Sequence, residues 1–169
     1  TIDEVNIAAI AERLASAPER GRIDVLVNNA GIAVNAPVEV LPMAEWHRQF
    51  DVNLFGHIAM TQALLPALLE SSGTVVNITS VGGKGAMATY GAYAGAKFAL
   101  EAVSESLAYE VRPFNIRVAI VEPGGIKTAF IPNMHLESRT YNDRGNPYAD
   151  LADRLRPTAP GGSEPSVVA

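Results

Sequence analysis

The stretch IDVLVNNAG at residues 23–31 decides the fold class of this chain. It opens with aliphatic and β-branched residues and stops at Asn29-Ala30-Gly31, a pattern typical of a strand that ends in a loop. Two similar runs lie further along the chain, TVVNIT at 74–79 and IRVAIV at 116–121. Apolar residues at helical spacing separate these runs. The chain therefore alternates strand, helix, strand, helix, strand.

This alternation is typical of parallel βαβ units, and we expect their right-handed crossovers to cover both faces of the sheet with helices. One helix is expected from about Pro42 to about Leu69, kinked near Pro66 and largely buried because apolar residues surround it. Another is expected from about Thr89 to Arg112. The fold class is thus α/β, with three parallel strands flanked by helices.

Both ends of the chain carry weaker patterns. Thr1 and Glu4 form a capping-box pattern, which predicts a helix before the first strand. From Ile126 onward the chain is richer in polar residues, Pro and Gly. That part predicts a helix near 146–156, a mobile segment at 157–165 and the first turn of a helix at 166–169. We expect one partial domain over residues 1–169.

Composition narrows the classes of function. The chain has 169 residues, 48% hydrophobic and 18% charged, which suits one globular domain with a core. Its net charge of −5 offers no basic surface to nucleic acid or to an anionic membrane. No run of 18 apolar residues predicts a membrane span, and the absence of cysteine excludes disulfides and thiolate chemistry. We therefore expect a cytoplasmic protein without nucleic-acid or membrane partners.

Residues 93–97 (YAGAK) carry the strongest signal for chemistry. Tyr93 and Lys97 stand at positions i and i+4 and share one face of the predicted helix. An ammonium near a phenol favours the phenolate and lowers the phenol pKa, which suits a tyrosine that exchanges a proton with an alcohol or a carbonyl. Ser80 ends a strand, at the edge where open parallel sheets bind ligands, and its hydroxyl could hold the substrate oxygen.

Each of these signals also has a plainer interpretation. A Tyr–Lys pair taken alone is more often an ordinary helix pair, and Asn53 in mid-helix is ordinarily solvated or bonded to its own backbone. His47, His57 and His135 lack the spacing of metal ligands, so no metal site is expected. The sequence GKG at 83–85 is no phosphate-binding loop, because no Ser or Thr follows the lysine.

Five motifs that occur together in one order favour the functional interpretation over the plainer ones. The chain resembles the short-chain dehydrogenase/reductase family at residues 28–31 (NNAG), 51–56 (DVNLFG), 76–80 (VNITS), 93–97 (YAGAK) and 123–128 (PGGIKT). The resemblance covers residues 1 to about 130 and implies a Rossmann-like, doubly wound parallel sheet. Residues 126–160 would then form the substrate-loop region.

The resemblance also implies a role for each matching residue. Tyr93 would be the general acid/base, Lys97 would lower its pKa and bind the nicotinamide ribose, and Ser80 would orient the substrate carbonyl. Asn53 would help hold a water that links Lys97 to solvent. The implied activity is hydride transfer between an alcohol and a ketone or aldehyde. The NAD or NADP cofactor would lie against Asn28, Asn29, Ala30, Gly31, Tyr93, Lys97, Pro123, Gly124, Ile126 and Thr128.

The sequence also departs from the family pattern. It contains no TGxxxGxG loop to receive the cofactor pyrophosphate, and no preceding strand whose end would separate NAD from NADP. We therefore expect an internal fragment whose three strands leave both sheet edges unpaired. By itself such a fragment should be marginally stable, bind cofactor poorly and lack activity.

Two other classes of function stay open. A non-catalytic fragment would act as an interaction or oligomerisation module, because apolar residues cover much of the 89–112 helix; for the full-length protein we expect a homodimer or homotetramer. A nucleotide-binding regulator is disfavoured because Ser80, Tyr93 and Lys97 are all present. The substrate is expected to be a small alcohol or ketone, whose identity the sequence does not reveal.

Overall fold

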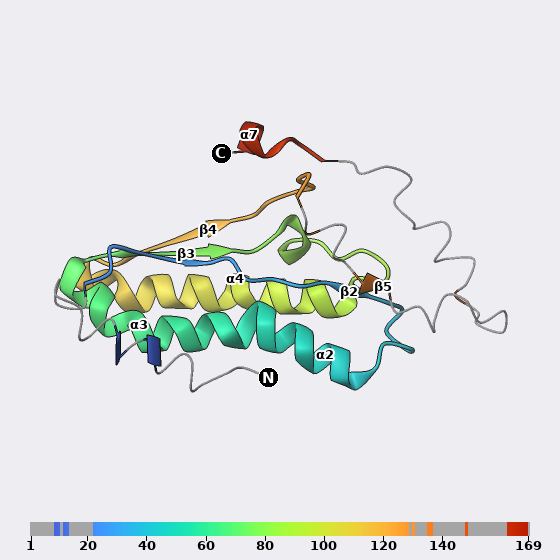
Figure 1. Cartoon of the computed structure of the whole chain (residues 1–169), viewed down its shortest axis with the longest axis horizontal. Coiled ribbons are helices and arrows are strands. Elements are labelled where there is room, and N and C mark those ends of the chain that lie inside the picture. The colour runs from blue at the N-terminus through green and yellow to red at the C-terminus, as the bar shows by residue number, and fades with distance from the viewer. Residues whose placement is uncertain are drawn as a thin grey trace.

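The computed structural model describes residues 22–128, together with 9–10, 12–13, 130, 135–136, 148 and 162–168. Three strands form a parallel sheet in the order β1 (Val25–Asn28), β3 (Thr74–Ile78) and β4 (Arg117–Val121). The register pairs Leu26 with Val75 and Val75 with Val118. The expected parallel sheet is therefore confirmed, with each strand one or two residues shorter than the sequence pattern indicated (Figure 1).

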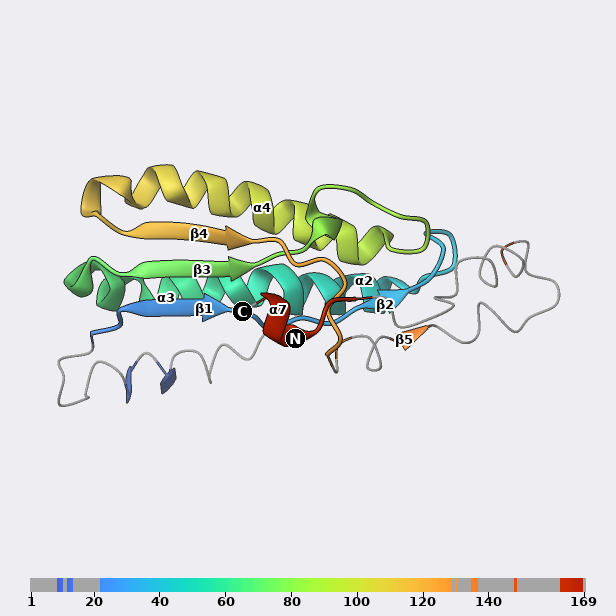
Figure 2. The ribbon, with the colours of Figure 1, turned by 90° about the horizontal axis from the view of Figure 1, so that it is seen from above.

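Two long helical segments connect the strands and lie on the same face of the sheet (Figures 1 and 2). The first consists of α2 (Met43–Phe50), the π-helical turn η1 (Asp51–Phe55) and α3 (Gly56–Ser71), and the second is α4 (Gly91–Val111). Both crossovers move in the same direction across the sheet, so the right-handed rule places both helices on one side. The expectation of helices on both faces is therefore wrong for the described residues.

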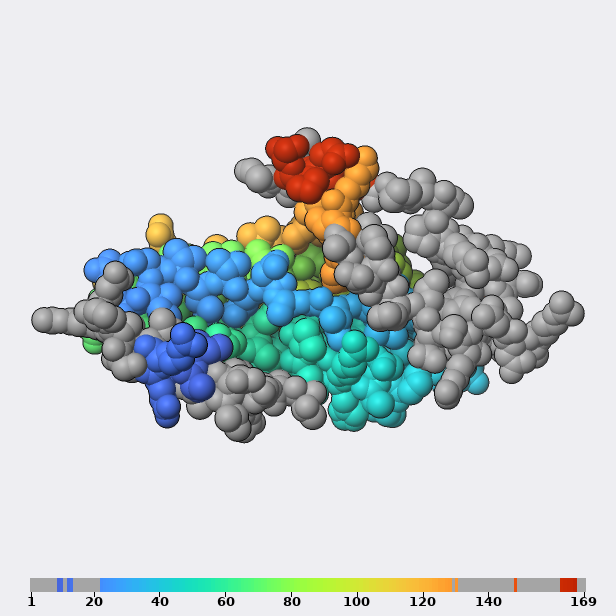
Figure 3. All heavy atoms as spheres, in the orientation of Figure 1, coloured from blue at the N-terminus to red at the C-terminus, as the bar shows by residue number. Residues whose placement is uncertain are grey.

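The other face of the sheet is apolar and exposed. Val25 and Val27 of β1 are each 53% exposed, and Val121 of β4 is 40% exposed. Strand register places Val76 and Ile78 of β3 on this same face. α7 (Pro165–Val168) stands on that side, close to the segment 122–128 (Figure 3).

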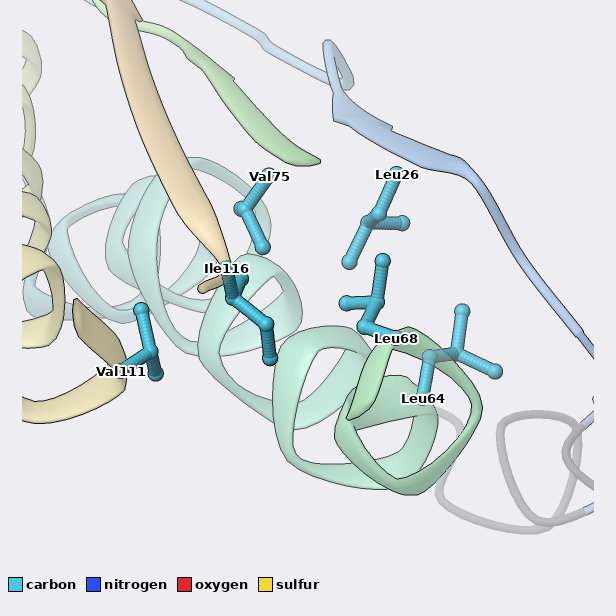
Figure 4. Close-up of a cluster of buried hydrophobic side chains, with 6 residues drawn as sticks. All are labelled: Leu26, Leu64, Leu68, Val75, Val111 and Ile116. Atoms are coloured by element: carbon cyan, nitrogen blue, oxygen red, sulfur yellow. The ribbon is translucent and has the colours of Figure 1, made fainter. Parts of the chain in front are cut away.

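The main hydrophobic core lies between the sheet and the helices, toward the amino ends of the strands. Leu68 of α3 and Val75 of β3 are fully buried at its centre. α4 and the start of β4 complete the cluster through the residues drawn in Figure 4: Leu26, Leu64, Leu68, Val75, Val111 and Ile116. This arrangement leaves the carboxyl ends of the strands to polar side chains.

The helix expected over 42–69 differs from its prediction in two respects. Pro66 lies inside α3, which continues to Ser71 and ends where Ser72 takes a left-handed conformation (φ 52°). The helix is not largely buried, since Phe55 and Leu69 are 46% and 41% exposed. Residues 43–71 also meet the length and composition criterion for a membrane span, which core helices of globular domains meet equally. Here the segment packs on the sheet and on α4.

The remaining elements are short. β2 (Val34–Asn35) pairs with β5 (His135–Leu136), and η2 (Val81–Gly83) and η3 (Arg112–Phe114) are single 3₁₀ turns. α4 begins at Gly91 rather than at Thr89, because Thr89 has a φ of 71° that no right-handed helix accommodates.

The outcome of the terminal predictions is mixed. α7 confirms the helical turn expected at 166–169, and residues 9–10 and 12–13 are helical as expected for the first helix. The capping box at Thr1 and the helix predicted near 146–156 lie outside the described residues, apart from Tyr148. Most of the segment predicted to be mobile, 157–161, lies outside them as well.

Candidate active site

The candidate site lies at the carboxyl edge of the sheet, where the loops after β1, β3 and β4 meet (Figure 2). Backbone hydrogen bonds tie two of these loops together: Thr79 N donates to Val121 O at 2.8 Å, and Val81 N donates to Pro123 O at 3.0 Å. Ligands of open parallel sheets bind at this edge, because the loops there diverge and leave polar groups accessible.

Ser80 and Tyr93 meet at this edge. Ser80 follows β3 in an extended conformation and caps η2, its Oγ accepting a hydrogen bond from Gly82 N at 3.0 Å. Tyr93, in the first turn of α4, is 9% exposed, and its phenol is hydrogen-bonded to Ser80. A Cβ on Gly82 would lie 3.2 Å from Tyr93 Cε1 and 3.4 Å from Ser80 Oγ, so this position favours glycine.

Lys97 lies one turn beyond Tyr93 and is buried. Its Nζ donates to Ile78 O at 2.9 Å and stands 6.0 Å from the centroid of the Tyr93 ring. Burial lowers the pKa of Lys97 to about 8. The ammonium therefore binds the end of β3 rather than the phenol.

The pKa of Tyr93 differs from the sequence expectation. Burial raises it, the hydrogen bond from Ser80 offsets part of that rise, and the neighbouring Tyr90 raises it further. Lys97, which the sequence analysis expected to lower this pKa, is not among the causes of the shift; its ammonium donates to Ile78 O. The phenol is thus held in its protonated form at neutral pH.

Asn53 is fully buried within η1 and binds the loop that follows β1. Its Oδ1 accepts from Ile32 N and its Nδ2 donates to Ile32 O, both at 2.9 Å. A Cβ on Gly31 would lie 3.4 Å from Asn53 Oδ1 and 3.9 Å from Lys97 Nζ, which places both side chains beneath this loop. The π-helical turn around Asn53 was not predicted, although such turns often occur at functional sites. The one feature of the sequence that could have indicated this turn is the asparagine inside an otherwise apolar helix.

Asn28 has a different environment from its neighbours in the NNAG segment. Its Nδ2 donates to Thr61 Oγ1 at 3.0 Å and to Asn77 Oδ1 at 2.8 Å. Asn77 Nδ2 in turn donates to Ser104 Oγ at 2.7 Å. This buried network joins β1 and β3 to α3 and α4, so the structure places the Asn28 side chain in the core. Asn29 and Ala30, by contrast, are exposed at the sheet edge.

His57 belongs to the site and was missed by the sequence analysis. One of its ring nitrogens, Nε2, lies 2.9 Å from Ala30 O, and Nδ1 has no hydrogen-bond partner among the described residues. Burial lowers the pKa of His57, and the charge of Lys97 lowers it further, against the bond to Ala30. The imidazole is therefore neutral at neutral pH. The sequence could have indicated this place, because His57 follows Asn53 by four residues and therefore shares its face of the helix.

The loop after β4 forms the other wall of the site. Gly124 and Thr128 are exposed, and no atom of the described residues lies within 4 Å of a Cβ built on Gly124. Pro123 and Ile126 are partly buried, and Ile126 forms a parallel bridge with Ser163 near α7. The open space at Gly124 leaves the backbone of this loop accessible to a ligand.

Two aromatic rings flank Tyr93. Tyr90 packs edge-on against it at 6.4 Å between ring centroids, and Phe130 lies at 6.0 Å. The acid/base candidate thus has two aromatic rings beside it. Within the described ranges, no three His, Asp or Glu side chains gather as metal ligands would.

Comparison with known proteins identifies the family. Residues 2–138 match the model of the short chain dehydrogenase family. The chain therefore belongs to the short-chain dehydrogenases, a family of oxidoreductases, as its five motifs implied.

Individual relatives agree. The chain is 36% identical over 149 residues to a 3-ketodihydrosphingosine reductase of Bacteroides thetaiotaomicron, covering 88% of this chain and 54% of the relative. It is 42% identical over 112 residues to human retinol dehydrogenase 8, covering 66% of this chain and 36% of the relative. The chain thus spans about half the length, or less, of these curated relatives.

Solved structures show the same fold. A short-chain dehydrogenase from Streptomyces avermitilis superposes with a TM-score of 0.72 at 40% identity, over 80% of this chain and 49% of that one. A metagenomic short-chain oxidoreductase in complex with NADP superposes with a TM-score of 0.66 at 35% identity, over 72% of this chain and 58% of that one.

Proposed function

We propose that the protein containing this chain is an NAD(P)-dependent dehydrogenase that interconverts an alcohol and a ketone or aldehyde, with Tyr93 as general acid/base. The observation that carries the proposal is the geometry at the sheet edge: a phenol hydrogen-bonded to Ser80, with the buried ammonium of Lys97 one helical turn away. The family, and relatives whose structures hold NADP, support the same chemistry.

The residues at this edge fit NAD or NADP. The exposed backbone at Asn29 and Ala30, with Gly31, would line the adenine-ribose side, and the open space at Gly124 would receive the nicotinamide end. Lys97 would bind a ribose hydroxyl, and Pro123, Ile126 and Thr128 would line the opposite wall. When bound, the nicotinamide supplies hydride transfer to or from the substrate carbon. Since the sequence contains no glycine-rich pyrophosphate loop, we expect weak cofactor affinity in this chain alone.

The protein's own residues would manage the substrate oxygen. Ser80 Oγ and the Tyr93 hydroxyl bind the carbonyl oxygen, and Tyr93 gives it a proton as the carbonyl carbon is reduced; the reverse direction returns that proton to Tyr93. Burial keeps the pKa of Tyr93 above its ordinary value, so the free site already holds the proton that reduction consumes. Asn53 acts here by fixing the loop above Lys97, and a water held near it would link Lys97 to solvent.

The surroundings of Tyr93 favour a substrate with an apolar group. Tyr90 and Phe130 place two aromatic rings beside the phenol. An alkyl or ring substituent next to the carbonyl would bury apolar surface against them, whereas a charged substituent would lose hydration without a partner. We therefore propose a ketone or secondary alcohol with an apolar substituent.

Tyr93→Phe tests the proposed function. We expect turnover to fall about 10²- to 10⁴-fold, because the variant lacks the proton that the substrate oxygen exchanges. The measurement follows NADH and NADPH absorbance with a panel of apolar ketones and alcohols, using the protein that contains this chain. Tyr109→Phe is the matched control, since Tyr109 lies on the same helix and is 77% exposed. Equal turnover in wild type and Tyr93→Phe would reject the proposal.

An oligomeric role is a second candidate, favoured by apolar residues on the outer sides of the helices. Phe55 and Phe98 are 46% and 44% exposed. We propose that these surfaces join copies of the protein into a dimer or tetramer. Light scattering should then show a smaller assembly for Phe98→Ser, and an unchanged mass would contradict the idea. The cytoplasmic location expected from composition stays a prediction.

A further inference from the structure

Lys84 ends the turn that follows Ser80 and contacts two other elements of the site. Its ammonium lies 3.0 Å from Glu101 Oε2 on α4 and 3.4 Å from Glu122 Oε1, which follows β4. α4 is the helix that carries the proposed acid/base, and Glu122 opens the loop 122–128. One ammonium therefore joins the three segments that enclose the reacting groups.

The carboxylate of Glu101 is unusual because it is buried. Glu101 is 5% exposed, and in the described part of the chain its Oε1 has no hydrogen-bond partner, while its Oε2 has the Lys84 ammonium at 3.0 Å. Burial of an unpaired carboxylate is costly, so the Lys84 ammonium supplies the charge that Glu101 requires. The side chain of Lys84 is 51% exposed and that of Glu122 is 39% exposed, which makes the pair with Glu101 the better shielded of the two.

The turn between Ser80 and Lys84 packs closely on α4. A Cβ on Gly83 would lie 3.1 Å from Glu101 Cγ and 3.2 Å from Lys97 O, so the turn already touches the helix at the level of Lys97. On its other side, Val81 N donates to Pro123 O at 3.0 Å. The position of Ser80 thus depends on a turn held from two directions, by a backbone bond and by the Lys84 ion pair.

We propose that Lys84 and Glu101 form a positioning pair that holds the Ser80 turn against α4 and thereby sets the contact between Ser80 and Tyr93. This inference rests on the proposed function. Neither residue touches the substrate in this scheme, so their removal should lower kcat more than it raises KM. A displacement near 1 Å of a group that orients a reacting atom can cost about 100-fold in rate.

The test uses the protein that contains this chain, with Lys84→Met, Glu101→Gln and the conservative Lys84→Arg. We expect kcat to fall about 10- to 100-fold in Lys84→Met and Glu101→Gln. KM and cofactor affinity should stay within a few-fold of wild type. Lys84→Arg should keep most of the wild-type kcat, because it preserves the positive charge. Arg22→Gln is the matched control, because the Arg22–Asp24 pair is exposed at the other end of β1. Wild-type kcat in both Lys84→Met and Glu101→Gln would overturn the proposal.

A readout without turnover separates this inference from the proposed function. The ¹³Cζ signal of Tyr93, assigned by its loss in Tyr93→Phe, reports the hydrogen bond to Ser80. In Lys84→Met it should move toward its position in Ser80→Ala, and an unchanged signal overturns the proposal. If the wild-type protein turns over no substrate, the proposed function fails, and the ¹³Cζ signal of Tyr93 alone decides whether Lys84 holds the Ser80 turn in place. If Lys84→Met does not fold, Glu101→Gln decides, because it leaves no uncompensated buried charge.

Discussion

Lys97, which we propose binds the cofactor ribose, lowers the stability of the fold because its charge is buried. It is 3% exposed, its ammonium donates to Ile78 O, and burial lowers its pKa to about 8 from 10.5. Between these two values the unfolded chain binds a proton that the folded chain does not. The cost of the buried charge is therefore complete below pH 8 and declines as the pH rises toward 10.5.

Replacing Lys97 by Met should make the protein more stable at neutral pH and inactive. A pKa shift from 10.5 to about 8 corresponds to roughly 3 kcal/mol, which the lost bond to Ile78 O partly offsets. The gain in unfolding free energy over wild type should be largest at pH 7 and small at pH 10. Urea unfolding of both proteins at the two pH values measures it. A gain that does not depend on pH would contradict the assigned pKa.

Asn53 is important for the loop that lies over Lys97. Asn53→Ala would leave both the N–H and the C=O of Ile32 without their partner. We expect a loss of about 2 kcal/mol of unfolding free energy, because the cost of orphaned polar groups exceeds the net gain of one hydrogen bond. Chemical unfolding compares it with Gln62→Ala, an exposed residue further along the same helical segment. A loss no larger than that control would show that Ile32 finds other partners.

At the scale of elements, α3 is held to the sheet by its buried leucines. Leu68 is fully buried between α3 and the strands, whereas the adjacent Leu69 is 41% exposed. Leu68→Ala should cost about 3 kcal/mol through lost burial and the cavity left behind, and Leu69→Ala less than 1 kcal/mol or so. The midpoint of urea unfolding distinguishes the two. Equal losses would mean that α3 does not pack on the sheet through this side.

At the scale of the whole molecule, the sheet has one covered and one exposed face. Val25, Val27 and Val121 lie on the exposed face, and β1 and β4 pair on only one side among the described residues. Exposed apolar surface and open sheet edges favour association between chains. They are consistent with an expectation of marginal stability for these 169 residues alone.

Val27→Thr should reduce aggregation of the isolated 169-residue chain, because threonine keeps the β-branched shape and removes apolar surface from the exposed face. The measurement is light scattering during heating, together with binding of a hydrophobic dye. Val38→Thr is the control, since Val38 is 68% exposed in a loop away from the sheet. The same aggregation temperature in Val27→Thr and wild type would indicate that another surface is responsible.

The sequence by itself determined the order of strands and helices, the parallel sheet and the family. These follow from local patterns: aliphatic runs that stop at Asn29-Ala30-Gly31, helical spacing between the runs, and five short motifs in one order. Tyr93 and Lys97 were identifiable because residues four apart on a helix share one face. Ser80 was identifiable because it ends a strand.

Only the tertiary structure decided what depends on residues distant in the chain. The location of both helices on one face follows from the direction of the crossovers, which requires the strand order. The raised pKa of Tyr93 follows from burial and from the neighbouring Tyr90. The burial of Asn28, the place of His57 beneath Ala30 and the Lys84–Glu101 pair likewise join separate elements. Local sequence carries no record of these contacts, because burial and charge environment arise only when distant segments pack together.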